Sequence, residues 1–146
     1  MKFSPLIFSC LMGWATLTSQ AQEPSPSSPS ATLVESAMTV QIVSVEQTQA
    51  LLAGGTPPIV IDIRTSQEFK KGHLEGAKLI DYRGKSFREE VAKLDRQQAY
   101  LIYCRSGVRS EKSLQIWEEL GFQQLYHMKS GMRSWRQKNG KTVTGL

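Results

Sequence analysis

Residues 100–110 read YLIYCRSGVRS, and the fold class can be worked out from this stretch outward. The apolar run at 100–103 predicts a short strand buried on both faces, and it ends abruptly at Cys104. From Ser110 onward the spacing of apolar residues predicts a helix. The sequence therefore places Cys104 in a tight loop between a strand and a helix, where backbone N–H groups and the helix dipole favour negative charge.

The composition of this loop favours a reactive thiolate over a structural thiol. Arg105 and Arg109 bring two positive charges close to Cys104. Gly107 allows the chain to turn tightly between them. A free cysteine is most often an inert buried residue, but that role requires neither arginine nor glycine nearby. Since positive charge and N–H groups lower the pKa of a thiol, we expect Cys104 to be a nucleophile at neutral pH.

The rest of the chain alternates predicted strands with predicted helices. Strands are expected at 39–43, 59–63, 78–80, 100–103 and 124–126, and helices at 45–52, 65–72, 86–94, 110–120 and 132–138. Capping boxes are expected to start three of these helices, pairing Ser44 with Gln47, Thr65 with Glu68 and Ser86 with Glu89. This alternation predicts an α/β domain with a central parallel sheet and helices on both faces. In such a sheet ligands bind at the carboxyl ends of the strands, where Cys104 and residues 62–65 lie.

Residues 1–21 have the features of a secretory signal peptide. Lys2 gives a positive start, residues 6–17 (LIFSCLMGWATL) are apolar, and residues 19–21 (SQA) fit a small-x-small cleavage site. The apolar run is too short to predict a transmembrane helix. We therefore expect a periplasmic or secreted protein with no stable membrane anchor after cleavage.

The predicted mature chain contains a linker, one domain and one cysteine. Residues 22–37 are rich in Pro and Ser and predict a flexible linker, which leaves 38–146 as a single domain. Cys10 is lost with the signal peptide, so Cys104 has no partner for an internal disulfide, and no metal site is expected. Removing Lys2 leaves 17 Lys and Arg against 13 Asp and Glu, a net charge of +4. These charges are scattered, which argues against nucleic-acid binding and is compatible with a small anionic substrate.

Three blocks of sequence resemble the rhodanese-like (thiosulfate sulfurtransferase) family in its single-domain form. They are DIR with EF and GHLEGA at 62–77, CRSGVRS at 104–110, and a C-terminal pattern of Gly121-Phe122, Gly131, Trp135 and Gly140. Ser130 departs from the pattern, because many members have a second glycine before Gly131. The resemblance covers nearly all of residues 39–140 and implies a three-layer rhodanese-like fold.

The resemblance also implies a reaction that needs no cofactor. Cys104 as thiolate would attack the outer sulfur of a donor such as thiosulfate and become a persulfide, and a thiophilic acceptor, cyanide or a thiol, would then take the sulfur. The N–H groups of the active-site loop would stabilise the thiolate and the persulfide. The loop consists of Arg105, Ser106, Gly107, Val108 and Arg109, and its two arginines are expected to hold the anionic donor.

Other residues of the resemblance are expected to support the structure. Asp62 is expected to pair with Arg64 or to accept from nearby N–H groups, and His73 is expected to be a hydrogen-bonded turn residue. Glu68 is expected near the mouth of the site, where its charge would oppose an anionic donor. The sequence leaves open whether Arg109 serves the substrate or the geometry of the loop.

Two other functions compete with sulfur transfer. Cysteine-dependent phosphatases and arsenate-type enzymes also use a cysteine in an anion-binding loop that ends in arginine, but related phosphatase loops place one more residue between the two than the four that separate Cys104 from Arg109. A non-catalytic module that carries sulfur or binds a partner is the second alternative. The presence of Cys104 argues against an inert module without separating an enzyme from a sulfur carrier.

Overall fold

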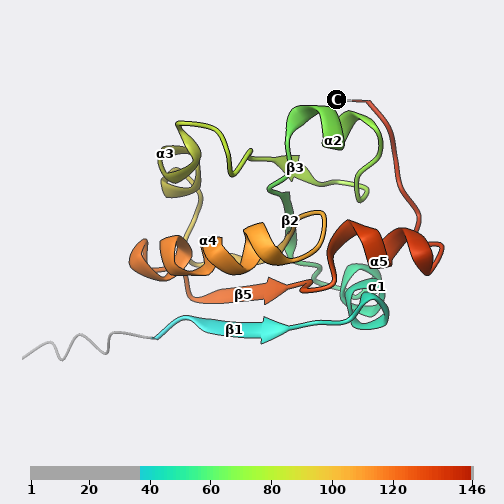
Figure 1. Cartoon of the computed structure of the whole chain (residues 1–146). Coiled ribbons are helices and arrows are strands. Elements are labelled where there is room, and N and C mark those ends of the chain that lie inside the picture. The colour runs from blue at the N-terminus through green and yellow to red at the C-terminus, as the bar shows by residue number, and fades with distance from the viewer. Residues whose placement is uncertain (1–36, 146) are drawn as a thin grey trace, which may run out of the picture. The chain divides into compact units, whose positions relative to one another are not determined.

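The computed structural model describes residues 37–145 and shows the predicted α/β architecture (Figure 1). The predicted signal peptide at 1–21 and the predicted linker, apart from Ala37, lie outside the described residues. In chain order the elements are β1 (Thr39–Ile42), α1 (Val45–Ala53), β2 (Ile59–Asp62), α2 (Ser66–Lys70), β3 (Lys78–Leu79), α3 (Phe87–Ala92), β4 (Ala99–Tyr103), α4 (Val108–Glu119), β5 (Gln124–His127) and α5 (Gly131–Gln137). Within this part of the chain, no helix is both long enough and apolar enough to span a membrane.

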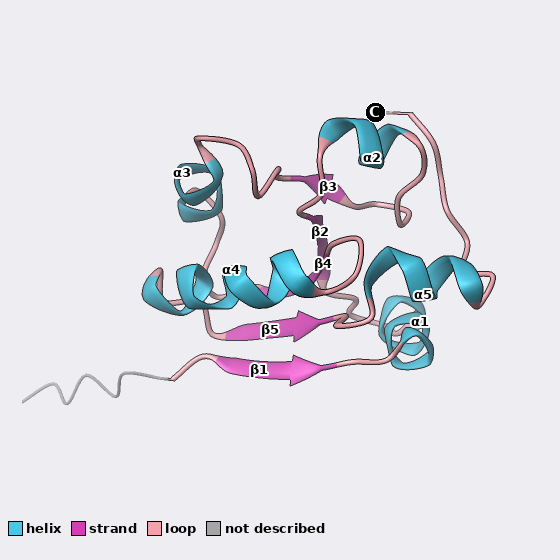
Figure 2. Cartoon of the chain, in the orientation of Figure 1, coloured by secondary structure: helices cyan, strands magenta, loops and turns pink. Residues whose placement is uncertain are grey.

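The five strands form one sheet in the order β1-β5-β4-β2-β3, and all of the pairs are parallel. Figure 2 shows the strands alternating with helices along the chain, as the sequence predicts. Because all strands run in one direction, the carboxyl ends of β2, β4 and β5 meet at the same edge of the sheet. This edge carries Asp62, Tyr103 and His127 as the last residues of those strands.

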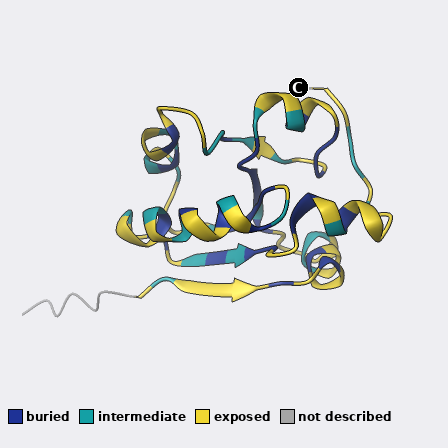
Figure 3. Cartoon of the chain, viewed as in Figure 1, coloured by how far each residue is buried: buried dark blue, intermediate teal, exposed yellow. Residues whose placement is uncertain are grey.

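Strands β2 and β4, which are neighbours inside the sheet, are buried on both faces, which explains their largely apolar sequences. Ile61 and Ile102 belong to a core that includes Trp117 of α4 and residues of α3. Val60 and Leu101, one position earlier in each strand, belong to a second core with residues of α1 and α5. Alternate side chains of these strands therefore pack against different helix layers. Strand β1, at one edge of the sheet, is exposed, as Figure 3 shows.

Two of the three predicted capping boxes are present, and the third prediction was wrong. The hydroxyls of Ser44 and Thr65 each accept a hydrogen bond from the backbone N–H three residues later, and their own N–H groups donate to the side chains of Gln47 and Glu68. Ser86 makes no such cap, because its hydroxyl donates instead to Glu90 Oε1 at 2.5 Å. The helix it precedes ends at Ala92, before the expected residue 94.

Helix α4 begins at Val108, two residues before the predicted start at Ser110. Gly107 precedes it as N-cap, with φ 89° and ψ −26°, a left-handed conformation that favours glycine. The early start places Ser110 inside the first turn. From there its hydroxyl donates to the Gly107 carbonyl at 2.9 Å. Gly107 belongs to the loop of residues 104–109 that carries the cysteine, called the cysteine loop below. The predicted stop at Gly121 is confirmed, since α4 ends at Glu119 with Leu120 as C-cap.

Candidate active site

The carboxyl end of β4 delivers Cys104 into a buried position. The strand is held on both sides by parallel neighbours, with Ile63 N–H donating to the Tyr103 carbonyl and Met128 N–H to the Ile102 carbonyl. Cys104 itself is 1% exposed and is the free cysteine of the described residues. The hydrogen bonds of β4 to its two neighbouring strands therefore fix the position of the thiol at the end of the strand.

Donors of the loop surround the Cys104 sulfur. Gly107 N–H donates to Sγ at 3.1 Å, and the Ser110 hydroxyl lies 3.6 Å from Sγ. Burial alone would raise the pKa of the Cys104 thiol, but the N–H groups of Ser106, Arg109 and Ser110 and the Ser110 hydroxyl outweigh it. The net effect is a pKa below the ordinary value. The loop is thus arranged to hold a thiolate inside the protein.

The first turn of α5 holds the backbone of the cysteine loop. Met132 N–H donates to the Cys104 carbonyl and Arg133 N–H to the Arg105 carbonyl, each at 2.9 Å. A Cβ on Gly131 would come within 2.6 Å of the Cys104 carbonyl oxygen, so only glycine permits this approach. The start of α5 therefore fixes the carbonyls of the nucleophile and of the residue that follows it.

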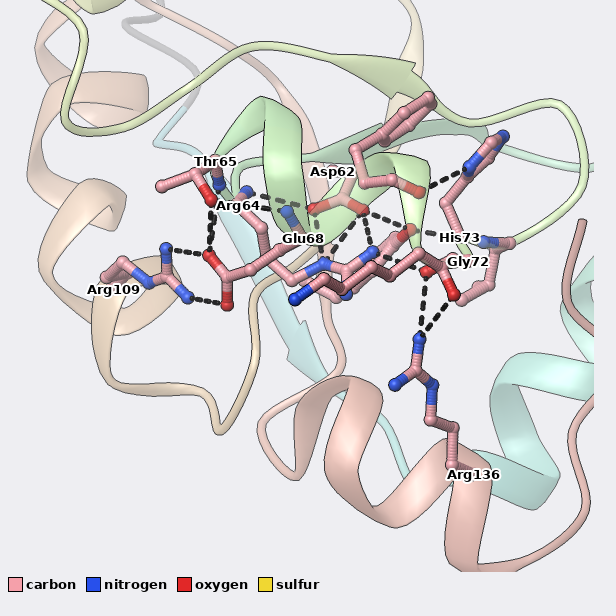
Figure 4. Close-up of polar contacts among 12 residues, drawn as sticks. Asp62, Arg64, Thr65, Glu68, Gly72, His73, Arg109 and Arg136 are labelled. Carbon is pink, nitrogen blue, oxygen red and sulfur yellow. Dashed lines mark hydrogen bonds and ion pairs between the residues drawn. The ribbon is translucent and has the colours of Figure 1, made fainter. Parts of the chain in front are cut away.

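Arg109 points from the cysteine loop to α2, where it pairs with Glu68 (Figure 4). Its Nη1 donates to Glu68 Oε2 at 2.9 Å and its Nη2 to Oε1 at 2.8 Å. The same carboxylate accepts from the N–H and hydroxyl of Thr65, the N-cap of α2. These bonds, that of Arg109 above all, lower the pKa of Glu68 to about 2. The charge expected to oppose an anionic donor is therefore matched by an arginine of the loop.

Arg105 is exposed and lines an open cavity of about 430 Å³ beside the cysteine loop. The lining residues are mostly cationic and come from three segments of the chain: Arg64, Glu68, Lys71, Arg105, Met132, Arg133 and Arg136. Val108, the next large apolar residue of the loop, is 56% exposed at the start of α4. The cavity that Arg105 shares with α2 and α5 thus carries an excess of positive charge.

Asp62 and Arg64 form a buried ion pair at the end of β2. Two nitrogens of the Arg64 guanidinium reach the carboxylate, the shorter contact being 2.5 Å between Nη2 and Oδ2. Asp62 also accepts from Arg64 N–H at 2.9 Å and from the Tyr103 hydroxyl at 2.7 Å. The Gly72 carbonyl accepts from both Arg64 and Arg136, as Figure 4 shows. The network joins β2, β4 and the turn after α2.

His73 lies in that turn and takes no part in the cysteine loop. Its ring stacks on Phe69 with centroids 3.6 Å apart, and its Nδ1 lies 3.0 Å from the Phe69 carbonyl oxygen. Its backbone exchanges two hydrogen bonds with Val143, which ties the C-terminal segment to the turn. These contacts place His73 in the architecture around the site.

The structure brings to the site several residues that the sequence did not single out. Lys71, Arg133 and Arg136 join Arg105 around the cavity, and His127 reaches Ser110 with its Nε2 2.8 Å from the hydroxyl oxygen. His127 could have been found, because it follows a predicted strand and therefore lies at the same sheet edge as Cys104. These side chains are distant in sequence, and hydrogen bonds from α5 to the Arg105 and Gly72 carbonyls bring their segments together. The described residues contain no cluster of side chains suited to a metal ion.

Comparison with solved structures gives the same architecture. A rhodanese-like domain protein from Staphylococcus aureus is 25% identical with a TM-score of 0.59, over 65% of this chain and 90% of that one. A rhodanese-related protein from Thermoplasma volcanium is 20% identical with a TM-score of 0.63, over 72% of this chain and 99% of that one. At such identities the second likeness concerns the fold alone.

Curated relatives match part of the chain. A tRNA uridine(34) hydroxylase of Bartonella henselae is 36% identical over 81 residues, which is 51% of this chain and 26% of that protein. A protein named "Probable adenylyltransferase/sulfurtransferase MoeZ", from Mycobacterium tuberculosis, is 32% identical over 84 residues, 58% of this chain and 21% of that protein. The chain therefore spans about a quarter of the length of these relatives.

The family model with the description "Rhodanese-like domain" matches residues 44–138, which include α1, the cysteine loop and all of α5. The match covers more than half of the chain, and it includes every contact described around Cys104. The chain belongs to the rhodanese-like domain family.

Proposed function

We propose that this protein is an exported sulfurtransferase that moves a sulfane sulfur from an anionic donor such as thiosulfate to cyanide or a thiol. The observation that carries the proposal is the Cys104 sulfur, buried and surrounded by N–H donors that lower the pKa of the thiol. A thiolate held in this way is a nucleophile, and the same donors stabilise a persulfide that replaces it.

In the proposed reaction the Cys104 thiolate attacks the outer sulfur of thiosulfate. The bond between the two thiosulfate sulfur atoms breaks, sulfite leaves with its electron pair, and Cys104 carries a persulfide. Cyanide then attacks the outer persulfide sulfur, thiocyanate leaves, and the thiolate is restored. No metal, redox cofactor or external proton is needed to balance either half.

The cationic cavity supports an anionic donor. Arg105 and Arg133 line it, and neither side chain has a hydrogen-bond partner among the described residues. Glu68 also lines the cavity, but its charge is matched by Arg109. We propose that Arg105 binds the donor, together with Arg133, and that Arg109 mainly supports the loop.

The contact of Arg109 with Glu68 disfavours a phosphatase. A phosphatase of this kind needs its loop arginine free to bind two oxygens of the phosphate, and here both terminal nitrogens of Arg109 bind a carboxylate. The spacing of Cys104 and Arg109 points the same way.

Intact-mass spectrometry after incubation with thiosulfate tests the proposal. We expect the protein to gain one sulfur atom and to lose it when cyanide is added, with thiocyanate appearing in equal amount. The Cys104→Ser variant is the control, because an alcohol cannot hold a persulfide, and the small substitution should leave the fold intact. A folded wild-type protein that gains no sulfur from thiosulfate, or a serine variant that still produces thiocyanate, would exclude this reaction.

A further inference from the structure

A buried histidine is connected to the nucleophile through a single hydroxyl group. His127, the last residue of β5, is 1% exposed, and its Nε2 lies 2.8 Å from Ser110 Oγ. Ser110 Oγ lies 3.6 Å from Cys104 Sγ and 2.9 Å from the Gly107 carbonyl oxygen. His127 is paired in register with Ile102 of β4, two residues before the cysteine, so the sheet itself sets this arrangement.

Counting protons assigns the tautomer of the imidazole. The Ser110 hydroxyl has one proton, and two of its neighbours, the Gly107 carbonyl and the Cys104 thiolate, can only accept. If Nε2 of His127 were unprotonated, three acceptors would surround one proton. If Nε2 carries a proton, it donates to Ser110 Oγ, and the hydroxyl proton is left for the sulfur and the carbonyl.

We propose that His127 carries its proton on Nε2 and acts as a positioning residue for Cys104, by donating to Ser110 Oγ and so keeping the hydroxyl proton available to the sulfur beside the Gly107 carbonyl. His127 touches neither the substrate nor the sulfur in this arrangement. The inference deepens the proposed function, on which its catalytic meaning rests, because the hydroxyl would support both the thiolate and the persulfide.

The surroundings keep His127 neutral. Burial lowers the pKa of the imidazole below its ordinary value, and Lys129 adds to this effect, while Glu111 and the Gly107 carbonyl oppose it. Lys129 and Glu111 form an exposed ion pair at 3.3 Å, so their fields at the ring partly cancel. The neighbouring strand β1 (TVQI) has no titratable side chain. A neutral ring that donates from Nε2 leaves the hydroxyl proton of Ser110 to the sulfur and the Gly107 carbonyl alone.

The rate of Cys104 alkylation by iodoacetamide, measured against pH, tests the proposal without a sulfur donor. In His127→Leu we expect the midpoint of the profile to rise by about one unit, so that alkylation at a pH below both midpoints slows about tenfold. His127→Gln should stay close to wild type, because its amide nitrogen can donate from a place near that of Nε2. His73→Gln is the matched control, since His73 is also buried but bonds to the Phe69 carbonyl.

A double variant separates positioning from a general structural effect. Ser110→Ala should raise the midpoint by at least as much as His127→Leu, and the two changes together should raise it no further than Ser110→Ala alone, because His127 acts through Ser110. A sum of the two single shifts, or an unchanged midpoint in folded His127→Leu, overturns the proposal.

The tautomer can also be read in the wild-type protein, which avoids any doubt about folding of the variants. A long-range ¹H–¹⁵N NMR spectrum at neutral pH should show the His127 proton on Nε2, and a proton on Nδ1 overturns the assignment. These readouts are independent of thiosulfate. If no persulfide forms while they come out as expected, the proposed function fails and the positioning of the thiol stands.

Discussion

Arg109 and Glu68 are the residues through which the cysteine loop contacts α2. Both side chains are largely covered, with 15% and 27% of their surfaces exposed, and the guanidinium binds both carboxylate oxygens. An ion pair of this geometry is worth more than a solvated surface pair, since it is bidentate and less screened.

Replacing Glu68 by Gln should therefore destabilise the protein in a pH-dependent way. The pKa of Glu68 is about 2 in the folded protein against an ordinary value of 4.5, so the pair contributes fully above about pH 4.5 and is lost as the pH falls toward 2. Urea unfolding at pH 7 should show a loss of about 1–2 kcal/mol, and the difference from wild type should shrink at pH 3. Glu119→Gln, which breaks the more exposed pair with Arg88, is the control and should cost less than Glu68→Gln. An equal cost for both variants would contradict this account of Glu68.

Arg105 and Arg109 should differ in what their loss changes. Arg105→Ala should lower kcat/KM for thiosulfate by about one to two decades, mainly through KM, because one charge-assisted contact to the donor is lost. The alkylation profile of Cys104 should not change. Arg109→Ala should lower the melting temperature and raise the pKa of Cys104, since the loop loses its link to Glu68. Steady-state kinetics and alkylation of both variants decide the matter, and an unchanged KM in Arg105→Ala would remove that residue from the donor site.

At the scale of elements, the cysteine loop depends on its contact with the turn before α5. A Cβ on Gly107 would lie within 2.8 Å of the Lys129 carbonyl carbon and still closer to its oxygen, and φ at Gly107 is 89°. The two loops can therefore approach each other only because position 107 has no side chain.

Gly107→Ala should cost clearly more than the conformational penalty of a left-handed alanine, which is about 1–2 kcal/mol. Gly76→Ala is a matched control, because Gly76 also has a positive φ, 73°, but a Cβ at that position would have no atom within 4 Å. Urea unfolding should give the larger loss for Gly107→Ala, and alkylation of Cys104 should lose its low-pH reactivity in that variant alone. Similar losses and similar alkylation in the two variants would show that the loops move apart without cost.

The elements that the sequence predicts well are those determined by local physics. The short apolar runs at 59–63 and 100–103, each bounded by turn residues, indicate buried strands. The capping boxes at Ser44 and Thr65 indicate helix starts, because the partner of each residue lies three residues later. The failed prediction at Ser86 has the same local pattern, but there the hydroxyl binds Glu90 instead. Helix α4 starts early, directly after Gly107, whose backbone lies against the Lys129 carbonyl in the loop between β5 and α5. Because that loop is distant in sequence, no local pattern at 107–110 reveals the contact.

The same distinction between local patterns and distant contacts applies to the candidate site. The spacing of CRSGVRS is enough to predict a thiolate loop, because the strand end, the glycine and the helix start are consecutive. The partner of Arg109 is not predictable from that loop, since Glu68 lies in α2, 41 residues earlier, and meets Arg109 only when β2 and β4 pair. The contact of His127 with Ser110 likewise requires the register of β4 and β5.

At the scale of the whole molecule, the buried network of Asp62, Arg64 and Tyr103 holds the two central strands to the turn that carries His73. Asp62→Ala should reduce the free energy of unfolding by about 3–5 kcal/mol, because it leaves the buried Arg64 charge without its partner. Urea unfolding measures this loss. The double variant Asp62→Leu with Arg64→Met should lose less than Asp62→Ala, since no buried charge then remains unpaired. A double variant that is less stable than the single one would mean that the pair itself, rather than the unpaired charge, accounts for the stability.

The position of β1 at the edge of the sheet has a consequence for how the protein is made. Within residues 37–145, β1 pairs only with β5, so Thr39–Ile42 has none of these partners until the chain has been synthesised as far as Gln124–His127. A growing chain can first pair β2 with β4, and it acquires the place for β1 later, when β5 is available. During that interval Val40 and Ile42, which remain exposed even in the finished fold, stand on a strand with both edges unpaired. The nascent chain, rather than the completed domain, is therefore the form of this protein in which we expect aggregation and the need for a chaperone to be greatest.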